Sequence, residues 1–530
     1  MLRREFLRAG GLVLSASVVT GLAGCSDGAA VRPSPVLSLQ SGQVQGQVVD
    51  GVHRFLGIPY AETPFAENRF RAPAARAPWQ GIFPADSYGF ACPQLGLVQP
   101  GTPKVGKDCL NLNVWTPDPS AGGLPVMVWA HAGDQSTGSG SLPVYDGSHF
   151  AVNGVVLVTC NRRLGAEGFL YLEELMGDGI GPGNLGVLDQ IEVLRWVQEN
   201  IHQFGGDANN VTLFGQSAGG AVVQAVVASP ASVGLVHKVI PQNASHGAQR
   251  PESAKEIARY VLQRVGVKAG DLSALKDKPW ADFAGLDKDI DALGLGQPQA
   301  YLPVLSEAMP VHPADAAHSG FGLQLDYLLG TCTDERAPFM TLSGNVKSSP
   351  FFARVERVLA LTGASWTDLV TAYRSFHPDL DKSAIDQFIV DDLSSGAANM
   401  RIAEGHALRS SGRTYTFRYD LMSGLGRNAH ALDRVPHGLD LMMFSNGNAQ
   451  TADLDSTAIE QTADFVRRSW VNFAKTGDPS SAACAWPEYD TEFRRTVAIN
   501  EAPSILHDPF AFQRKLLGKV MTDNWQLMGL

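Results

Sequence analysis

Positive charge is scarce in this sequence. Its 530 residues include 42 Lys and Arg against 53 Asp and Glu, which gives a formal net charge of −11. A nucleic-acid-binding surface needs concentrated Lys and Arg, so we exclude nucleic acid as a partner. The six cysteines show no zinc-ligand spacing, and the chain has no glycine-rich phosphate loop. We therefore expect neither a metal nor another cofactor.

Boundaries between domains are also lacking. Composition is even after the first few dozen residues, no Pro/Ser-rich linker divides the chain, and no internal repeat or heptad pattern is present. Hydrophobic residues make up 44% of the chain and charged residues 18%, as in ordinary soluble globular proteins. We expect one large domain over residues 36–530, with helical insertions at about 245–325 and 340–410.

The N-terminus differs from the rest of the chain. Arg3 and Arg4 precede an apolar run of about fourteen residues, which is too short to span a bilayer as a helix. The two arginines resemble a twin-arginine export signal, and the LAGC that ends at Cys25 resembles a bacterial lipobox. Residues 1–24 are interpreted as a signal peptide, Cys25 as an acylated residue and 25–35 as a flexible tether. This predicts an exported periplasmic or cell-envelope lipoprotein; the alternative is a soluble periplasmic protein with a chance cysteine.

Export would place the cysteines in an oxidising compartment. Cys92 and Cys109 lie seventeen residues apart around a Gly/Pro-rich loop, and they can be paired in a disulfide that would stabilise the fold by roughly 3 kcal/mol. The remaining three cysteines are predicted to be free, buried thiols: Cys160, Cys332 and Cys484.

Two continuous apolar runs, at 124–130 and 155–159, predict parallel strands that are covered on both faces. Between them lies a loop of small residues, 131–140, of the kind that binds ligands at the carboxyl ends of strands in α/β sheets. An amphipathic helix is predicted at 186–204. Further strands are predicted near four segments: 36–48 as an edge hairpin, 239–240, 327–329 and 414–419.

The segment 211–220, VTLFGQSAGG, combines a short β-prone run, a tight turn and a helical run, with Ser217 at the apex. Glycines flank the serine because a Cβ at either place would collide with the crossing backbone, and the turn would expose the hydroxyl above the sheet. This pattern is typical of a nucleophile elbow. The pentapeptide G-x-S-x-G can occur by chance in a chain of this length, so the interpretation depends on partners for the serine.

A serine hydroxyl is a weak nucleophile that needs a base, itself held by an acid. In α/β-hydrolases both partners follow the nucleophile in the chain. His437 lies in a Pro/Gly-bracketed loop just before an apolar run and is the predicted base, with His430 as the competitor. Asp334 and Glu335 lie side by side after a predicted strand, and the pattern alone does not separate them as the acid. The alternative for both is a solvated acidic loop.

Six segments between about residues 40 and 490 carry motifs in a defined order. They are FLGIPYA (55–61), DCLNLNVWTP (108–117), NRRLGAEGFL (161–170), GNLGVLDQ (183–190), FGGDANNVTLFGQSAGG (204–220) and WVNFAKTGDP (470–479). Together they resemble the type-B carboxylesterase family, the α/β-hydrolases that include carboxylesterases and cholinesterases. The resemblance implies a mostly parallel central sheet covered by helices on both faces, with helical insertions over the active site. It also implies a small-molecule ester as the substrate and no cofactor.

The resemblance implies a role for each member of a catalytic triad. Glu335 matches the family's acid and His437 its base. Ser217 would then attack the ester, His437 would move the proton and Glu335 would orient His437. The implied mechanism is a two-step acyl transfer in which water releases the acid.

The resemblance also implies two further features. The backbone N–H groups of the oxyanion hole would belong to Gly133, Asp134 and Ala218. Cys92 and Cys109 match the first disulfide of the family.

The sequence departs from the family pattern beside the nucleophile. Asp134 replaces a glycine of the H-G-G-G motif, which puts a carboxylate next to the developing oxyanion; Asp tolerates an unusual φ better than most residues. Gln216 replaces the Glu that commonly precedes the nucleophile. Our hypothesis is that Asp134 supplies the missing negative charge from another wall of the pocket, or points away from it.

Three smaller departures concern other parts of the chain. Lys107 replaces a Glu, so the usual ion pair with the arginine at Arg69 cannot form, and Arg336 replaces a glycine after the acid. The loop between Cys92 and Cys109 contains no tryptophan, which argues against a cholinesterase. We expect a serine hydrolase of uncharged carboxylic esters. The alternatives are a non-catalytic member that acts as a binding protein, and a hydrolase of amides, carbamates or lactones.

Overall fold

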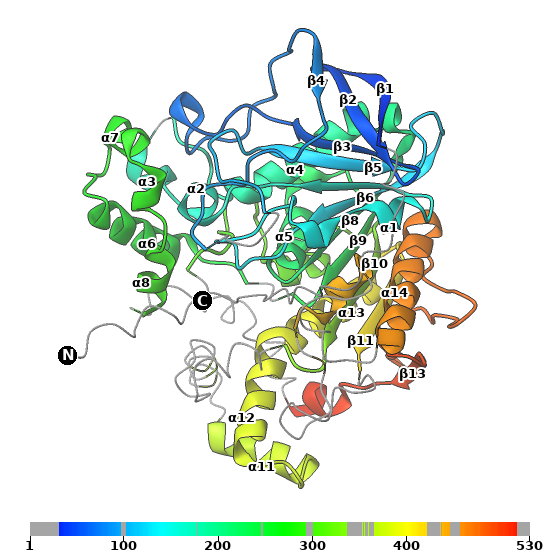
Figure 1. The fold of residues 1–530 in the computed structure, drawn as a ribbon. Coiled ribbons are helices and arrows are strands. Elements are labelled where there is room, and N and C mark those ends of the chain that lie inside the picture. The colour runs from blue at the N-terminus through cyan, green and yellow to red at the C-terminus, as the bar shows by residue number, and fades with distance from the viewer. Residues whose placement is uncertain are drawn as a thin grey trace, which may run out of the picture.

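The structure is a computed structural model that describes residues 31–96, 102–177, 179–244, 247–292, 300–335, 352, 355, 359, 365–420, 435, 437–445 and 456–516. These residues form one thirteen-stranded sheet with helices on both faces (Figure 1). The strand order is β1-β2-β3-β5-β7-β6-β8-β9-β10-β11-β12-β13, and β4 pairs with β2.

The strands are β1 Arg32–Leu39, β2 Gly42–Val49, β3 Val52–Pro59, β4 Ile82–Pro84, β5 Asn111–Thr116, β6 Leu124–Ala130, β7 Val156–Cys160, β8 Gly206–Gln216, β9 Lys238–Gln242, β10 Asp326–Cys332, β11 Thr414–Tyr419, β12 Arg495–Ile499 and β13 Ser504–His507. All neighbours from β7 to β12 along the strand order run parallel. Outside this centre, the pairs from β1 to β7 along the strand order and the β12–β13 pair are antiparallel, while β4 pairs with β2 in parallel. The predicted mostly parallel sheet is confirmed.

The first strand begins earlier than the sequence predicts. Arg32 pairs with Val48 and Pro33 with Gln47, so the predicted tether at 25–35 is wrong over its last four residues. Two prolines in RPSP indicated a flexible segment, but β1 lies at the edge of the sheet. A proline is tolerated there because its missing N–H leaves no ladder bond unmade.

Strand β6 shows why the apolar runs are continuous. Successive side chains of a strand point to opposite faces of the sheet. Val126 and Val128 enter one core with helices α4 and α5, while Met127 and Trp129 enter a second core with α1 and α14. Both faces of the central strands are therefore buried, as the sequence predicts.

The helices divide between these faces and two insertions (Figure 1). Those that cover the sheet are α1 Ser148–Ala151, α4 Leu185–Asn200, α5 Ala218–Val227, α13 Ala397–Arg409 and α14 Ser456–Thr476. A 3-10 turn at Ile201–Phe204 extends α4, which accounts for the predicted helix at 186–204. Between β9 and β10 lie α6 Pro251–Arg264, α7 Leu272–Asp277 and α8 Leu286–Ala292, and before α13 lie α11 Trp366–Phe376 and α12 Lys382–Asp391.

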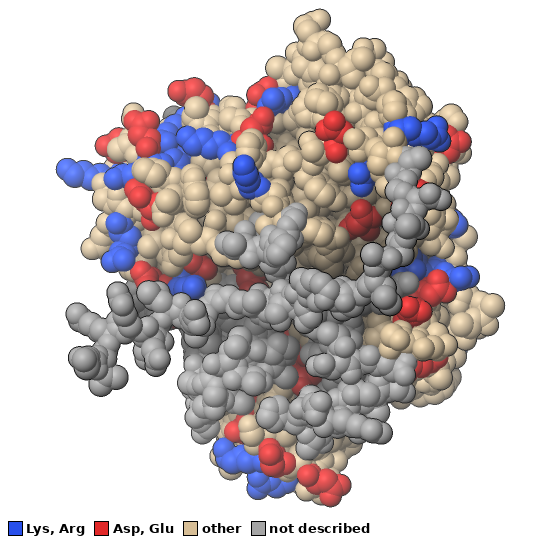
Figure 2. Space-filling model, in the orientation of Figure 1, with Lys and Arg blue, Asp and Glu red and all other residues tan. Residues whose placement is uncertain are grey.

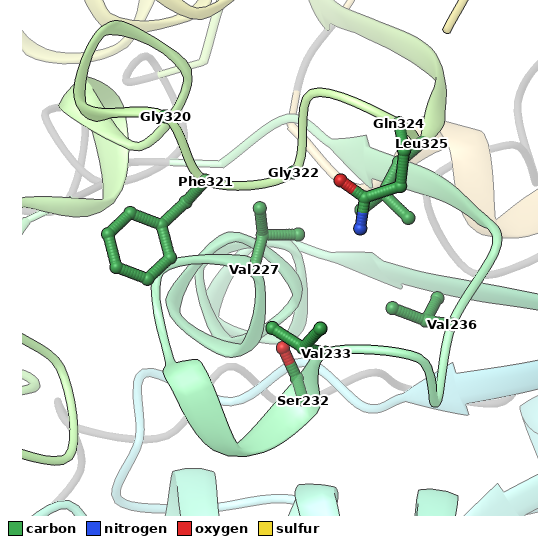
Figure 3. Close-up of a pocket in the computed structure, with 9 residues that line it drawn as sticks. All are labelled: Val227, Ser232, Val233, Val236, Gly320, Phe321, Gly322, Gln324 and Leu325. Atoms are coloured by element: carbon green, nitrogen blue, oxygen red, sulfur yellow. The ribbon is translucent and has the colours of Figure 1, made fainter. Parts of the chain in front are cut away.

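The surface shows a mixture of charges on one face and an apolar pocket at the end of α5. On the face drawn in Figure 2, Lys and Arg alternate with Asp and Glu over the described residues. An apolar pocket of about 260 Å³ lies at the C-terminal end of α5, where Val227, Phe321 and Leu325 line it (Figure 3). Ten helical residues place this pocket about 15 Å from the N-terminus of α5.

No helix among the described residues has the length and apolar character needed to cross a bilayer.

Candidate active site

The nucleophile elbow lies where β8 ends and α5 begins. Ser217 has φ 56° and ψ −122°, a conformation that non-glycine residues rarely adopt. A Cβ at Gly219 would lie 1.9 Å from the carbonyl oxygen of Ala130, and one at Gly215 would lie 2.7 Å from the same atom. Both flanking positions therefore require glycine, and Ser217 is partly exposed at the apex.

The structure brings Glu335 and His437 together across 102 residues of sequence. Nδ1 of His437 lies 2.5 Å from Oε2 of Glu335, and a carboxylate there requires the ring nitrogen to donate. Oε1 of Glu335 accepts from the Thr331 hydroxyl at 2.5 Å and the Cys332 N–H at 2.7 Å. Burial raises the pKa of Glu335, but the hydrogen bond from His437 and those from the other donors outweigh burial and lower it. Glu335 is thus held ionised, and in the neutral imidazole the proton therefore lies on Nδ1 and leaves Nε2 as the acceptor.

The neighbouring Asp334 has a different role. Both of its carboxylate oxygens lie 3.0 Å from Nε2 of Gln387. Its main chain accepts from the N–H of His437 at 3.1 Å and donates to the carbonyl of Val435 at 3.0 Å. Asp334 therefore positions the loop that carries His437, while Glu335 contacts the imidazole. The residue pattern alone left these two acids unseparated, whereas the family resemblance assigned the acid to Glu335; in the structure their side chains point to different partners.

A further contact to His437 comes from the residue before the nucleophile. Nε2 of Gln216 lies 3.2 Å from Nε2 of His437, and Gln216 is buried at the end of β8. Since Nδ1 of the ring is committed to Glu335, the amide of Gln216 donates to Nε2. A neutral hydrogen-bond donor thus occupies the position where the sequence comparison leads one to expect a carboxylate.

Gln242, at the end of β9, connects three segments around the site. Its carbonyl accepts from the N–H of Ser217 at 3.0 Å. Its side-chain amide donates to Asp440 at 2.8 Å and accepts from the indole N–H of Trp470 at 3.0 Å. Gln242 is not among the predicted site residues, because an amide at the end of a short strand carries no distinctive pattern.

Asp440 is a second buried carboxyl group beside the His437 loop. The pKa of Asp440 is raised to about 7, mainly by burial; the charge of His437 opposes this rise and that of Glu335 adds to it. Its side chain is 0% exposed and lies in the 3-10 turn Leu439–Met443. Asp440 is also not among the predicted site residues. Its position could have indicated a role in the site, because it is an acid three positions after the predicted base, inside an apolar run.

The small-residue loop after β6 lies against the elbow helix. Gly133 has φ 126°, and a Cβ there would lie 2.0 Å from the carbonyl oxygen of Thr137. Asp134 and Gln135 follow with φ 54° and 61°. The amide of the buried Gln135 donates to the carbonyl of Ala218 at 3.0 Å. The three residues predicted to donate to an oxyanion therefore belong to two segments that this hydrogen bond ties together.

The side chain of Asp134 is exposed on this loop. Its charge contributes to raising the pKa of Asp291 in α8 to about 7, after burial and the charge of Asp287. The charges of Asp287 and Asp134 thus both act on the carboxyl group of Asp291.

The remaining candidate residues are either buried in the loop after β6 or lie outside the described residues. His131 is fully buried, with Nδ1 2.8 Å from the carbonyl of Ala132. Burial and then the charge of Arg162 hold the pKa of His131 well below its usual value, so it is a neutral residue of the loop. Cys25, His430 and Arg336 lie outside the described residues. The described part of the chain holds no group of three or more His, Cys, Asp or Glu that could bind a metal ion.

The expected Cys92–Cys109 disulfide is absent from the structure, in which both residues are buried thiols. Their sulfur atoms lie 2.9 Å apart. A covalent S–S bond requires about 2.05 Å, so the pair is in contact without being bonded. The three remaining cysteines are buried and free, as predicted: Cys160, Cys332 and Cys484.

Arg69 cannot form its usual ion pair because Lys107 replaces a Glu, and Glu167 from another segment pairs with Arg69 instead. Arg69 pairs with Glu167 at 2.5 Å, and both side chains are buried. The ammonium of Lys107 instead lies 5.7 Å from the centre of the Phe65 ring. Arg69 is therefore paired despite the departure from the family pattern.

The sequence model of the Carboxylesterase family matches residues 33–515. The chain belongs to the carboxylesterase family. It is 34% identical to the para-nitrobenzyl esterase of Bacillus subtilis (strain 168) over 498 residues, covering 91% of this chain and 98% of the relative. It is 30% identical to the phenmedipham hydrolase of Pseudarthrobacter oxydans, covering 88% and 95%. It is 32% identical to the acetylcholinesterase of Bungarus fasciatus, covering 92% and 88%.

Solved structures agree with this membership. A PNB esterase aligns with a TM-score of 0.80 at 32% identity, covering 92% of this chain and 99% of the other. The carboxylesterase EST55 of Geobacillus stearothermophilus aligns with a TM-score of 0.78 at 30% identity, covering 91% and 99%. This carboxylesterase therefore has the predicted α/β-hydrolase fold and is a carboxylic ester hydrolase.

Proposed function

We propose that Ser217, His437 and Glu335 form the catalytic triad and hydrolyse esters through an acyl-enzyme. The Oγ of Ser217 attacks the ester carbonyl while Nε2 of His437 takes its proton, and Glu335 stabilises the imidazolium through Nδ1. The proton then passes to the leaving alcohol. Water, activated by His437, releases the acid in the second step. The observation that carries this proposal is the 2.5 Å contact between Glu335 and His437 beside the strained elbow.

The proposed oxyanion hole consists of the N–H groups of Gly133, Asp134 and Ala218. Each such donor typically lowers the barrier by roughly 2.7 to 4 kcal/mol. The positive φ of Asp134 supports this assignment, because a left-handed turn can direct consecutive N–H groups to one side. The side chain of Asp134 is exposed, which keeps its charge away from the buried part of the loop.

The proposed substrates are uncharged carboxylic esters. A para-nitrobenzyl esterase is among the relatives, so p-nitrobenzyl and p-nitrophenyl esters are suitable first substrates. A panel of p-nitrophenyl esters with acyl chains of two to twelve carbons, roughly the range of short and medium esters, would define the acyl preference.

We further propose that the protein is exported and anchored through an acylated Cys25, and that Cys92 and Cys109 form a disulfide there. The arginines and the lipobox-like LAGC support the first proposal. The 2.9 Å contact between the two sulfur atoms supports the second. Mass spectrometry of the protein from a membrane fraction, with and without reduction, tests both: a lipid on Cys25 and a Cys92–Cys109 peptide pair are expected.

A fluorophosphonate probe tests the triad. We expect covalent labelling of the wild-type protein at Ser217, no labelling of Ser217→Ala, and loss of p-nitrophenyl butyrate hydrolysis in that variant. Absence of labelling and of turnover in the folded wild-type protein would show that this member is a binding protein instead.

A further inference from the structure

Two consecutive arginines follow β7, and they differ in how their charges are balanced. Arg163 donates to the two carboxylate oxygens of Asp189 at 2.8 and 2.6 Å. Arg162 is equally buried, with 1% of its surface exposed. Its Nη2 donates to the side-chain oxygen of Gln135 at 3.3 Å, while Nε and Nη1 have no hydrogen-bond partner among the described residues. One guanidinium is therefore fully paired, and its neighbour is not.

The charge of Arg162 persists at neutral pH. Burial lowers its pKa to about 10, so the group remains protonated. The groups that favour its charged form most are Cys160 and then Tyr145. Burial raises the pKa of each of these to about 12, so both are neutral near pH 7. A buried cation without a carboxylate partner is costly to keep, which makes its location informative.

That location is directly behind the loop proposed to bind the oxyanion. Arg162 donates to Gln135, and the amide of Gln135 donates to the carbonyl of Ala218 at 3.0 Å. The carbonyl of Gln135 also accepts from the N–H of Gly165 at 2.7 Å. At the start of the loop, the charge of Arg162 helps to keep His131 neutral. Arg162 thus acts on the loop at its start, His131, and at its middle, Gln135.

The backbone of the loop explains why such support is needed. Asp134 and Gln135 both have positive φ, and two consecutive non-glycine residues in this region are held only when the surrounding structure fixes them. The side chain of Gln135 is fixed by an acceptor and a donor at its two ends. Removing Arg162 would release one of these ends and leave a buried amide oxygen without its donor.

We propose that Arg162 is a positioning residue that holds the oxyanion loop against α5 through Gln135 and supplies a fixed positive charge for the tetrahedral oxyanion. The proposal rests on the proposed function, because it assigns Arg162 to the same reaction. A charge that develops on the carbonyl oxygen in the transition state is stabilised by a preorganised cation in a water-poor site more than the neutral ground state is. Arg162 therefore acts on kcat more than on KM.

The test compares Arg162→Met, Arg162→Lys and wild type with p-nitrophenyl butyrate and with a trifluoromethyl ketone, which forms an anionic tetrahedral adduct with an active-site serine. We expect Arg162→Met to lower kcat on the order of 10- to 100-fold, less than the loss of a direct oxyanion donor. KM should stay within about threefold, and the ketone should bind more weakly by the factor lost in kcat. Arg162→Lys should regain part of both losses because it restores the charge.

Two controls separate this role from stability and from net charge. Arg195→Met removes an arginine that is 46% exposed on α4 and should leave kcat and the ketone affinity unchanged. If Arg162→Met does not fold, Gln135→Met keeps the guanidinium but breaks its link to Ala218, and it should also lower kcat and ketone affinity together. A folded Arg162→Met or Gln135→Met with kcat within threefold of wild type, or with undiminished ketone affinity, overturns the proposal. Failure of the triad is seen separately, as a wild-type protein that neither turns over ester nor reacts with the fluorophosphonate.

Discussion

Nε2 of Gln216 lies 3.2 Å from Nε2 of His437, the nitrogen that must accept the proton of Ser217 in the proposed reaction. On the other side of the ring, Nδ1 lies 2.5 Å from the Glu335 carboxylate. The imidazole is therefore held between a charged acceptor and a neutral donor. The amide of Gln216 competes with the serine hydroxyl for the lone pair of Nε2, and it adds no negative charge to the site.

Gln216→Glu should move the acid limb of kcat/KM upward by roughly one pH unit, because a carboxylate this close to Nε2 stabilises the imidazolium. A stabilised imidazolium loses its proton at higher pH, so the neutral base is present over a narrower range. Profiles of p-nitrophenyl butyrate hydrolysis between about pH 5 and 9 measure the shift. Gln216→Met removes the donor without adding charge, so it should shift the limb upward by less, and a shift in Gln216→Met as large as that in Gln216→Glu would contradict this explanation.

Glu335→Gln should lower kcat by about a thousandfold or more, because an amide can neither stabilise the imidazolium nor enforce its tautomer. Asp334→Asn is the matched comparison on the adjacent residue. Its side chain accepts from the amide of Gln387, so we expect a loss below about tenfold, from weaker positioning of the loop. Single-turnover rates with the same ester would check both, and the reverse order of effects would assign the acid to Asp334.

Gly219→Ala should abolish measurable turnover and destabilise the fold by about 1–3 kcal/mol or more, since its methyl group would lie 1.9 Å from a carbonyl oxygen of β6. Gly122→Ala provides the control, because a Cβ there meets nothing within 4 Å. Urea unfolding followed by tryptophan fluorescence, together with fluorophosphonate labelling, measures the two effects. A labelled, fully stable Gly219→Ala protein would be incompatible with the geometry of the elbow.

Asp440 should make the stability of the wild-type protein fall as pH rises from about 4 to 7. Its folded pKa of about 7 lies above the ordinary value of about 3.9, so in this window the unfolded chain gives up a proton that the folded protein keeps. The slope for one group is at most about 1.4 kcal/mol per pH unit. Gln242, Glu335 and His437 face this carboxyl group.

Asp440→Asn has no proton to lose, so the free energy of unfolding of the variant relative to wild type should increase between pH 5 and 7 and then level off. Urea titrations at four pH values measure this difference. A difference that stays constant with pH would mean that Asp440 is ionised in the folded protein throughout.

The sequence predicted those features that depend on local pattern. The central strands were recognisable because burial on both faces makes every position of a segment such as 124–130 apolar. The elbow was recognisable because two glycines are sterically required around Ser217. These constraints act between residues that are close in sequence, so a short sequence pattern is enough to predict both features.

The features that the sequence did not predict depend on contacts between distant segments. The residue pattern did not separate Asp334 from Glu335, although the family resemblance assigned the acid to Glu335; their different contacts, with Gln387 and His437, are visible only in the fold. The motif NRRLG does not distinguish Arg162 from other arginines, and only the fold shows that its guanidinium donates to Gln135. The start of β1 was misplaced because an edge strand can contain prolines, which in isolation indicate an irregular segment.

Gln242 has a consequence for motion in the enzyme. This one residue of β9 is hydrogen-bonded to the main chain of Ser217, to Asp440 in the turn after His437 and to Trp470 in α14. Because of these hydrogen bonds, we expect displacement of any one of these segments to move the others. The separation between Ser217, the proposed nucleophile, and His437, the proposed base, should then vary less than the position of either. We therefore expect substrates of different size to be accommodated by other segments, with little change in the distance that the proton crosses between Ser217 and His437.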